Sequence, residues 1–282
     1  MSKSKLIIHG GFFSESNTNQ EVKKAKQDAL SEIAIKSHAY LNSHTALQTV
    51  VYCVSLLEDC ELFNAGLGSQ VQSDGKIRLS ASLMDSVSKK FSGVINIEDV
   101  KNPIQIAEKL LVYDDSVLSG EGALDFARKN GFDFFNPETE QRRSEYYKKL
   151  EASRIGTVGC VVVDAAGNLA AGTSTGGKGF EIPCRVSDSA TVAGNYANEY
   201  AAISCTGVGE DIVSVAMAAK IVTRVTDGFS LQEATDKSFA ELKTFDGFAG
   251  IIGISASGEI YHCDSHPYMV WASFDETLEV FD

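Results

Sequence analysis

The stretch IGTVGCVVVD, residues 155–164, sets the architecture that we expect of this chain. It places Thr157 directly after Gly156, at the head of an apolar run rich in β-branched residues, which favours a buried strand. Cutting the Gly156–Thr157 bond would give the threonine a free α-amine with a reference pKa of about 7.7–8.0. Near neutral pH such an amine acts as the base that makes the hydroxyl of its own residue nucleophilic. The alternative is that Thr157 is simply the first residue of a strand.

The composition is typical of a globular protein with a substantial core. The 282 residues are 44% hydrophobic and 22% charged, enough for one large domain or two small ones. The net charge of −13 argues against a nucleic acid or an anionic membrane as partner, because both need clustered lysine and arginine. The apolar stretch at residues 6–8 is too short for a secretory signal and no apolar run approaches a membrane span, so we expect a cytoplasmic protein.

The cysteines and histidines give no sign of a cofactor. The six cysteines include no CxxC pair, and we expect them to be reduced and mostly buried. The five histidines lack metal-binding spacing, and His9, which precedes two glycines, is expected to be structural. We therefore predict no organic cofactor.

Apolar periodicity predicts a mixture of helices and strands. Helical spacing predicts helices over residues 20–41, 46–57, 104–113, 122–129 and 211–225, with a further helix after a capping box at Ser230. Short apolar runs predict strands over residues 6–9, 71–73, 77–83, 158–164, 169–174, 250–254 and 259–263. Several of these strands are joined by tight turns such as Asp74-Gly75, which makes them antiparallel. We expect a single α+β domain over residues 1–282, with two mainly antiparallel sheets in a four-layer αββα sandwich.

Residues 134–156 differ from the rest of the chain. They are rich in charged residues, begin with an Asn-Pro turn signal and hold few apolar side chains. This composition predicts a mobile linker. The alternative is an exposed charged helix over residues 138–152. Both interpretations leave Gly156 accessible.

The segment GTSTGGKG, residues 172–179, is close to a phosphate-binding loop. It lacks the Ser or Thr after the lysine that would bind Mg²⁺, and Pro183 would interrupt the helix that should follow. We therefore interpret it as a strand that ends in a tight glycine turn and exposes Thr175.

Two further segments carry candidate binding groups. Arg185 and Asp188 place a cation and an anion three residues apart, able to bind the two charged ends of an α-amino acid. The alternative is an ordinary surface ion pair. In SCTGVGE, residues 204–210, Thr206 and the Gly207 amide have the positions of an oxyanion hole at a strand-to-helix turn. The alternative is a turn with a helix cap.

Seven segments in chain order resemble the plant-type asparaginases, or isoaspartyl peptidases. The matching strings are HGG (residues 9–11), LEDCELFNAGLG (57–68), ASLMD (81–85), GTVG (156–159), DAAGNLAAGTSTGG (164–177), RVSDS (185–189) and SCTGVGE (204–210). The resemblance implies an N-terminal-nucleophile (Ntn) hydrolase with an αββα sandwich. The precursor would cut itself between Gly156 and Thr157 into an α subunit, residues 1–156, and a β subunit, residues 157–282. Two such αβ heterodimers would pair.

The resemblance also implies roles for individual residues. Thr157 would be the nucleophile and its own amine the base, with Thr175 orienting the hydroxyl and Asn64 lying near it. Thr206 and the Gly207 N–H would form the oxyanion hole. Three residues would bind the substrate: Arg185 its α-carboxylate, and Asp188 with the Gly209 carbonyl its α-ammonium. A structural sodium ion would lie in a loop of backbone carbonyls contributed by Leu57, Glu58, Cys60, Phe63, Ala65 and Leu67.

The function that the resemblance implies is hydrolysis of L-asparagine and β-aspartyl dipeptides, with release of L-aspartate through an acyl-enzyme. The alternatives are a related glycosylasparaginase, a taspase-like endopeptidase, or a homologue that does not cut itself and binds an amino acid. Relatives commonly have glycine where this chain has Cys184 and Ser187, and threonine in place of Val208. The bulky Phe12 and Phe13 follow the HGG segment. These departures leave the preferred leaving group open.

Overall fold

The structure, a computed structural model, describes residues 4–12, 19–148, 156–245, 247–266 and 268–282. Its helices are α1 Gln20–Leu41, α2 Ala46–Glu58, α3 Pro103–Leu110, α4 Gly120–Lys129, α5 Glu140–Tyr147, α6 Gly209–Val215, α7 Met217–Thr226 and α8 Leu231–Leu242, followed by a 3₁₀ turn at Lys243–Phe245. Its strands are β1 Lys5–Phe12, β2 Leu79–Asp85, β3 Phe91–Ile97, β4 Val117–Ser119, β5 Thr157–Val163, β6 Leu169–Thr175, β7 Asn195–Ala197, β8 Ala201–Gly207, β9 Ala249–Ser255, β10 Ile260–Asp264, β11 Met269–Asp275 and β12 Thr277–Val280.

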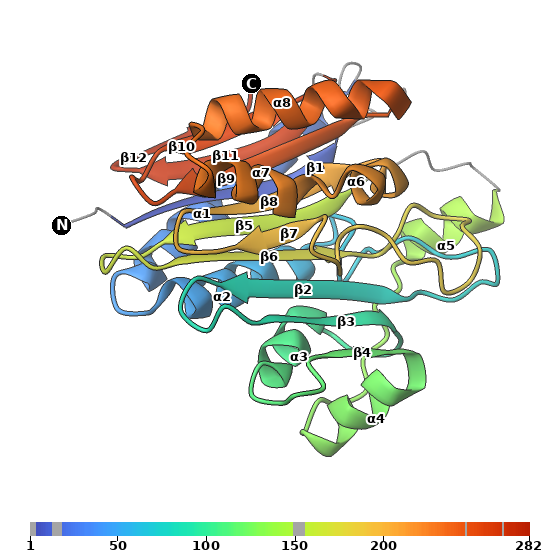
Figure 1. The fold of residues 1–282 in the computed structure, drawn as a ribbon. Coiled ribbons are helices and arrows are strands. Elements are labelled where there is room, and N and C mark those ends of the chain that lie inside the picture. The colour runs from blue at the N-terminus through green and yellow to red at the C-terminus, as the bar shows by residue number, and fades with distance from the viewer. Residues whose placement is uncertain (1–3, 13–18, 149–155, 246, 267) are drawn as a thin grey trace.

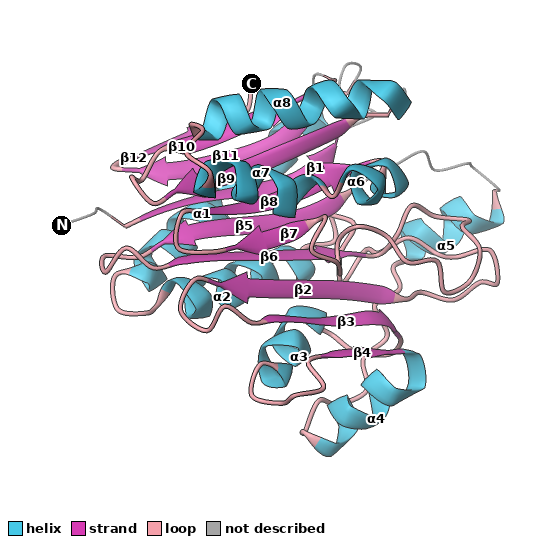
Figure 2. Ribbon diagram, in the orientation of Figure 1, coloured by secondary structure: helices cyan, strands magenta, loops and turns pink. Residues whose placement is uncertain are grey.

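The described strands form two sheets (Figures 1 and 2). The larger sheet has the order β12-β11-β1-β5-β6-β2-β3-β4 and the smaller one β10-β9-β8-β7. The strand pairs are antiparallel apart from β3 with β4, which is parallel. The predicted α+β class, with mainly antiparallel sheets, is therefore confirmed.

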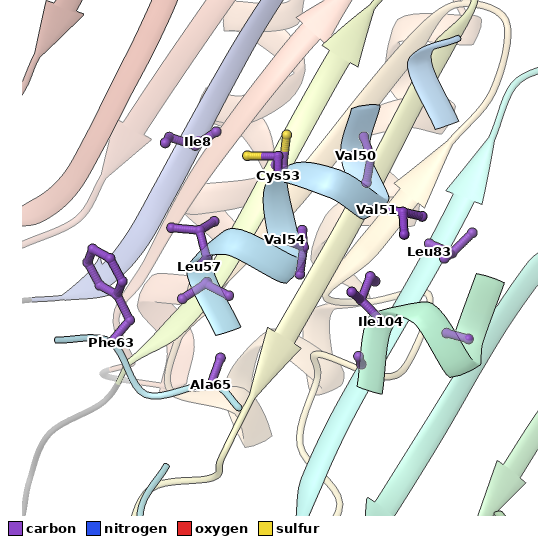
Figure 3. Close-up of a cluster of buried hydrophobic side chains, with 14 of the residues drawn as sticks. Ile8, Val50, Val51, Cys53, Val54, Leu57, Phe63, Ala65, Leu83 and Ile104 are labelled. Carbon is purple, nitrogen blue, oxygen red and sulfur yellow. The ribbon is translucent and has the colours of Figure 1, made fainter. Parts of the chain in front are cut away.

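Helices α1, α2 and α3 cover one face of the larger sheet. Figure 3 shows α2 lying across this face, where Val54 and Leu57 pack with Ile8 of β1 and with buried side chains of β5. Alternate residues of β5, Val158 among them, point into this core, because successive side chains of a strand face opposite ways. Burying a side chain the size of Leu57 contributes about 1.5–3 kcal/mol.

The opposite face of the larger sheet packs on the smaller sheet. Val161 and Val163 of β5 share a buried cluster with Ile252 and Ile254 of β9. The far side of the smaller sheet is covered by α7 and α8, whose apolar residues form a third cluster with those of β8 and β9. Thr157 and Gly159 lie on the same face of β5 as Val161, so the start of this strand points between the sheets.

The hairpin predicted around Asp74-Gly75 is wrong in one of its strands. The turn forms, with the Gly75 N–H donating to the Gln72 carbonyl at 2.9 Å, but residues 71–73 are not a strand. Of these described residues, only Gln72 bonds across the turn, its N–H donating to the Lys76 carbonyl at 2.8 Å. On either side of it the backbone bonds to a loop: the Phe180 N–H donates to the Val71 carbonyl at 2.9 Å, and the Ser73 N–H to the Glu181 carbonyl at 3.1 Å. β2 pairs with β3 and β6, so residues 71–73 have no strand beside them to join.

The single helix predicted over residues 211–225 is also wrong, because two helices occupy this range. Ala216 separates α6 from α7 and has a left-handed backbone, with φ of 50°. The N–H groups of Ala218 and Ala219 donate to the carbonyls of Ala193 and Val192 at 2.8 and 3.1 Å. A contact with a distant loop therefore replaces the hydrogen bonds that would continue one helix.

The remaining predicted elements are confirmed with small shifts of their ends. The helix over Gln20–Leu41 matches at both ends, whereas α3 ends three residues before the predicted position 113. The strands β3, β4, β7, β11 and β12 were missed. No helix within the described ranges combines the length and the apolar character that crossing a membrane requires.

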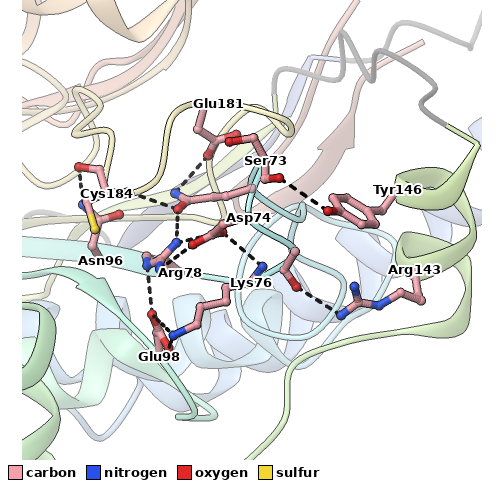
Figure 4. Close-up of polar contacts among 12 residues, drawn as sticks. Ser73, Asp74, Lys76, Arg78, Asn96, Glu98, Arg143, Tyr146, Glu181 and Cys184 are labelled. Atoms are coloured by element: carbon pink, nitrogen blue, oxygen red, sulfur yellow. Dashed lines mark hydrogen bonds and ion pairs between the residues drawn. The ribbon is translucent and has the colours of Figure 1, made fainter.

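The described part of residues 134–156 includes α5. Arg142 of this helix is 7% exposed and donates to the Gly68 carbonyl at 2.7 Å. Figure 4 shows Arg143 and Tyr146 of α5 reaching the turn around Asp74, where Arg143 donates to the Gly75 carbonyl and the Tyr146 hydroxyl to the Ser73 carbonyl. The end of the predicted linker, residues 149–155, lies outside the described residues, and the mobility of the linker stays a prediction.

Candidate active site

Thr157 begins β5 and faces Thr175 at the end of β6. The two residues are register partners, and the Thr157 hydroxyl donates to Thr175 Oγ1 at 3.3 Å. A third hydroxyl, Ser189 Oγ, lies 3.4 Å from Thr157 Oγ1. Thr157 is only 5% exposed, so its hydroxyl lies in a largely desolvated place.

The carbonyl oxygen of Gly156 accepts two side-chain hydrogen bonds. Asn64 Nδ2 donates to it at 2.8 Å and Thr175 Oγ1 at 3.4 Å. The Asn64 amide is itself fixed, since Nδ2 also donates to the Gly177 carbonyl at 2.5 Å and Oδ1 accepts from the Gln70 N–H at 2.9 Å. The peptide bond before Thr157 therefore has a polarised carbonyl beside a threonine hydroxyl.

Glycines allow the backbones around this bond to approach closely. A Cβ on Gly11, which has φ of +86°, would come within 2.7 Å of Gly156 Cα and 2.9 Å of Thr157 N. A Cβ on Gly156 would lie 3.0 Å from Asn64 Cβ. Any side chain at Gly11 would thus push β1 away from the bond between Gly156 and Thr157.

A cavity of about 230 Å³ opens beside Thr157. It brings together six residues singled out from the sequence: Gly156, Thr157, Thr175, Arg185, Gly207 and Gly209. Gly177, Lys178, Ser187, Val208 and Glu210 complete its lining. Asn64, Asp188 and Thr206 lie behind this lining, each at most 4% exposed.

Arg185 presents a fork of donors in the cavity. Its Nε donates to Glu210 Oε1 at 2.8 Å and its Nη2 to Glu210 Oε2 at 2.6 Å. The hydrogen bonds from Arg185 lower the pKa of Glu210 to about 2, so this carboxylate is charged at every physiological pH. The fork shows that Arg185 binds a carboxylate bidentately, as expected of a guanidinium.

Asp188 lies close to Arg185 but is buried, at 1% exposure. Its Oδ1 accepts from Ser187 Oγ at 2.7 Å, and its Oδ2 has no hydrogen-bond partner among the described residues. Burial raises the pKa of Asp188 to about 6, against the effect of the Ser187 hydroxyl and of Arg185. A Cβ on Gly209 would lie 2.7 Å from Asp188 Oδ1, so the bare glycine leaves the carboxylate open to a small cation.

Thr206 and Gly207 end β8 at the cavity. Thr206 Oγ1 is buried and makes no hydrogen bond within the described ranges. Gly207 has φ of +141°, and a Cβ there would lie 2.4 Å from the Phe248 carbonyl oxygen, so only glycine fits. An unused hydroxyl beside a cavity-lining glycine is consistent with a pair of donors for a developing oxyanion.

Cys184, which precedes Arg185, has a strained backbone. Its φ of 66° lies in the left-handed region that favours glycine. Figure 4 shows the contacts that hold it: its N–H donates to Gln72 Oε1 at 3.1 Å, and Asn96 Nδ2 donates to its carbonyl at 2.9 Å. These bonds hold the backbone at Cys184 to the segment before β2 and to β3. They thereby fix the position of the backbone from which the Arg185 side chain extends.

Ser189 and Lys178 were missed as site residues. Ser189 lies in the segment RVSDS that carries part of the family resemblance. Nothing in the sequence indicated, however, that Ser189 contacts Thr157. His9 was interpreted as structural, and burial lowers its pKa to about 3, which keeps it neutral. Its Nε2 lies 3.0 Å from Ser204 Oγ. Both atoms pack against Gly159, where a Cβ would come within 2.3 Å of His9 Nε2.

The loop of residues 57–67 has free carbonyl oxygens. Three of the predicted ligand carbonyls already accept hydrogen bonds within the loop. Leu57 accepts from the Cys60 N–H at 3.3 Å, Glu58 from the Leu67 N–H at 2.7 Å, and Cys60 from the Phe63 N–H at 3.1 Å. In the described part of the chain, no hydrogen bond ends on the carbonyls of Phe63, Ala65 or Leu67. Unpaired backbone oxygens are the ligands that hard cations such as sodium prefer, so the loop fits such an ion.

Comparison with known proteins identifies the family. The asparaginase family model matches residues 2–154 and 137–279, which together span most of the chain. The chain belongs to the asparaginase family of hydrolases. The resemblance to plant-type asparaginases and isoaspartyl peptidases is therefore confirmed.

Three relatives illustrate the similarity. An isoaspartyl peptidase/L-asparaginase of Nostoc sp. is 45% identical over 91% of this chain and 87% of its own length. One of the same name from Synechocystis sp. is 41% identical over 99% of this chain and 91% of its own. A plant-type L-asparaginase of Pyrococcus horikoshii is 34% identical over 97% of both chains.

Replacing Asp188 by Asn tests the burial of this carboxyl. The pKa of Asp188 is about 6 in the folded chain, above the ordinary 3.8 of an aspartate, so its contribution to stability is full below pH 3.8 and is lost as the pH rises through 6. Asp188→Asn, compared with its parent in the same Thr157→Ala background, is expected to raise the free energy of unfolding by about 1–3 kcal/mol at pH 8 and to leave it nearly unchanged at pH 4.

Melting temperatures at the two pH values measure this difference. The matched control is Asp28→Asn, since Asp28 is an exposed residue of α1 paired with Lys24. A shift of equal size at pH 8 and pH 4 would show that Asp188 does not titrate as its burial implies.

Proposed function

We propose that this chain is a self-processing threonine hydrolase that releases L-aspartate from L-asparagine and from β-aspartyl dipeptides. The observation that carries the proposal is the Thr157 hydroxyl, which lies beside the doubly hydrogen-bonded Gly156 carbonyl in a cavity with Arg185 and Gly207. The two packed sheets with helices on both outer faces support assignment to the four-layer αββα Ntn-hydrolase fold.

Self-cleavage uses the groups around Gly156. Thr157 Oγ1 attacks the Gly156 carbonyl carbon, the C–N bond breaks as the nitrogen takes up a proton, and an ester forms. Asn64 and Thr175 stabilise the negative charge that develops on the Gly156 oxygen. Water then hydrolyses the ester, which frees both the hydroxyl and the α-amine of Thr157.

Substrate hydrolysis follows with the freed amine as base. Thr157 Oγ1 attacks the side-chain carbonyl of the substrate, while Thr206 and the Gly207 N–H stabilise the oxyanion. Removing one such donor typically costs about 10²–10³ in rate. The amine product leaves, and water releases aspartate from the acyl-enzyme.

Binding of the aspartyl part depends on charge. Arg185 binds the α-carboxylate, and its donors already hold the Glu210 carboxylate in a fork. The α-ammonium lies between the Asp188 carboxylate and the Gly209 carbonyl. The Cβ position of Gly209 lies 2.7 Å from Asp188 Oδ1, so an ammonium beside Gly209 would hydrogen-bond to this oxygen, which already accepts from Ser187 Oγ.

Two further features belong to the same proposal. A structural sodium ion would be held by the carbonyls of Phe63, Ala65 and Leu67, with those of Leu57, Glu58 and Cys60 completing the set, and would order the loop that presents Asn64. The family resemblance further implies that two αβ heterodimers pair.

Replacing the nucleophile or Arg185 tests the proposed activity. Thr157→Ala is expected to abolish release of ammonia from L-asparagine and of leucine from β-aspartyl-leucine. Arg185→Ala is expected to raise KM by about 10-fold or more, since a charged hydrogen-bonded contact contributes about 1.5–3 kcal/mol. Steady-state assays with both substrates measure these effects, and Arg128→Ala is the control at an arginine whose partners lie in other loops. Substrate turnover by Thr157→Ala, or an unchanged KM in Arg185→Ala, would contradict the assigned roles.

Asn64 gives a separate test of the self-cleavage step. Asn64→Ala removes the shorter of the two hydrogen bonds to the Gly156 carbonyl and is expected to slow cleavage by about 10²-fold. The fraction of uncut chain, followed with time on a denaturing gel, measures the rate. Asn168→Ala, in the turn between β5 and β6, is the matched control and is expected to cut at the wild-type rate. Equal rates in Asn64→Ala and the wild type would remove Asn64 from the mechanism.

A further inference from the structure

Lys178 and Glu210 are charged cavity residues that the steps above do not use. The Lys178 and Glu210 side chains are 49% and 48% exposed, whereas the Arg185 side chain is 14% exposed and Thr157 5%. The two residues therefore lie at the mouth of the cavity, with the nucleophile deeper inside.

Glu210 forms a bidentate ion pair with Arg185. Its two oxygens occupy the Nε and Nη2 donors of the guanidinium, which leaves the Nη1 side of Arg185 for a substrate carboxylate. With the charge of Glu210 matched in this way, Lys178 supplies the remaining positive charge among the cavity-lining side chains.

Lys178 is weakly held. Its Nζ approaches Glu210 Oε1 at 3.4 Å, longer than the 2.8 Å from Arg185 Nε to the same oxygen. Ion pairs between exposed side chains contribute little to stability, so the ammonium can turn to another anion at low cost. The backbone before Lys178 is fixed in contrast, because the Gly177 carbonyl accepts from Asn64 Nδ2 at 2.5 Å.

The two cations lie close enough together for one substrate to reach both with its two ends. Both Lys178 Nζ and Arg185 Nε contact Glu210 Oε1, so the two nitrogens lie within about 6 Å of each other. The two carboxylates of an extended β-aspartyl dipeptide, which are separated by one trans amide and the bonds on either side, lie about 7 Å apart. L-Asparagine has only the first of these carboxylates.

We propose that Lys178 binds the free carboxylate of the leaving amino acid, so that the cavity selects β-aspartyl dipeptides with a free C-terminus. The inference rests on the proposed function, because it needs the aspartyl part bound at Arg185 and the amide bond at Thr157. Lys178 then determines specificity for the leaving group and takes no part in bond breaking.

A comparison of two substrates tests the role of Lys178. We measure kcat/KM for β-aspartyl-leucine and for its C-terminal amide, with the fully cut enzyme and with L-asparagine as the internal reference. The wild type is expected to favour the free acid by about two- to five-fold, the effect of one half-exposed ion pair. Lys178→Gln is expected to bring the ratio close to one, and Lys178→Arg to restore most of it. Because the Lys178 ammonium is half exposed, added salt is expected to weaken its attraction for the substrate carboxylate and so to lower the wild-type ratio of kcat/KM for acid over amide.

Lys89→Gln is the matched control. Lys89 forms a half-exposed ion pair with Glu199 beyond the Asp85 end of β2, while Thr175 pairs with Ser80 at the other end. Its substrate ratio is expected to equal that of the wild type. A ratio that is the same in Lys178→Gln and the wild type would overturn the role of Lys178 while leaving the proposed function intact. A wild-type enzyme that hydrolyses neither the dipeptide nor L-asparagine would overturn both.

Discussion

The hydrogen bonds to the Gly156 carbonyl hold the site together. Asn64 lies in the loop between α2 and β2, and Thr175 at the end of β6. Both side chains donate a hydrogen bond to this one oxygen. The same two residues also contact Gly177, so the carbonyl, the end of β6 and the start of β5 are fixed relative to one another. A disturbance of any of these segments would change the position of the Thr157 hydroxyl relative to the Gly156 carbonyl.

Burial and exposure give the two carboxyls of the site opposite properties. Glu210 is half exposed and paired with a guanidinium, which lowers its pKa to about 2. Asp188 is buried with an unpartnered oxygen in the described structure, and desolvation raises its pKa to about 6. Glu210 is thus charged near neutral pH and orients Arg185. A bound ammonium would instead compensate Asp188 for the hydration that its carboxylate loses on burial.

Local signals predicted much of the fold. The helix over Gln20–Leu41 and the capping box at Ser230 depend on neighbouring residues, and both were predicted correctly. The strand over residues 71–73 and the unbroken helix over 211–225 were wrong because loops at residues 180–181 and 192–193 take their backbone hydrogen bonds. Such partners lie far away in the sequence, and apolar spacing carries no signal of them.

The candidate site shows the same division. Thr157, Thr175, Arg185 and Gly207 carry recognisable chemistry in quoted motifs, and the cavity brings them together. The contact between Ser189 and Thr157, and the fork between Arg185 and Glu210, depend on how the loop between β6 and β7 packs against β5 and α6. The resemblance supplied the place of Asn64, but its two hydrogen bonds to carbonyls required the structure.

The central claim is that the bond before Thr157 breaks by the action of Thr157 itself. Intact-mass analysis of the purified protein after incubation, with N-terminal sequencing of the products, tests it most directly. The account predicts that the 30.3 kDa chain splits into two fragments, one of which begins Thr-Val-Gly-Cys, and that a chain with alanine at position 157 stays whole. A hydrolytically active wild-type protein that remains a single chain of full mass would contradict it.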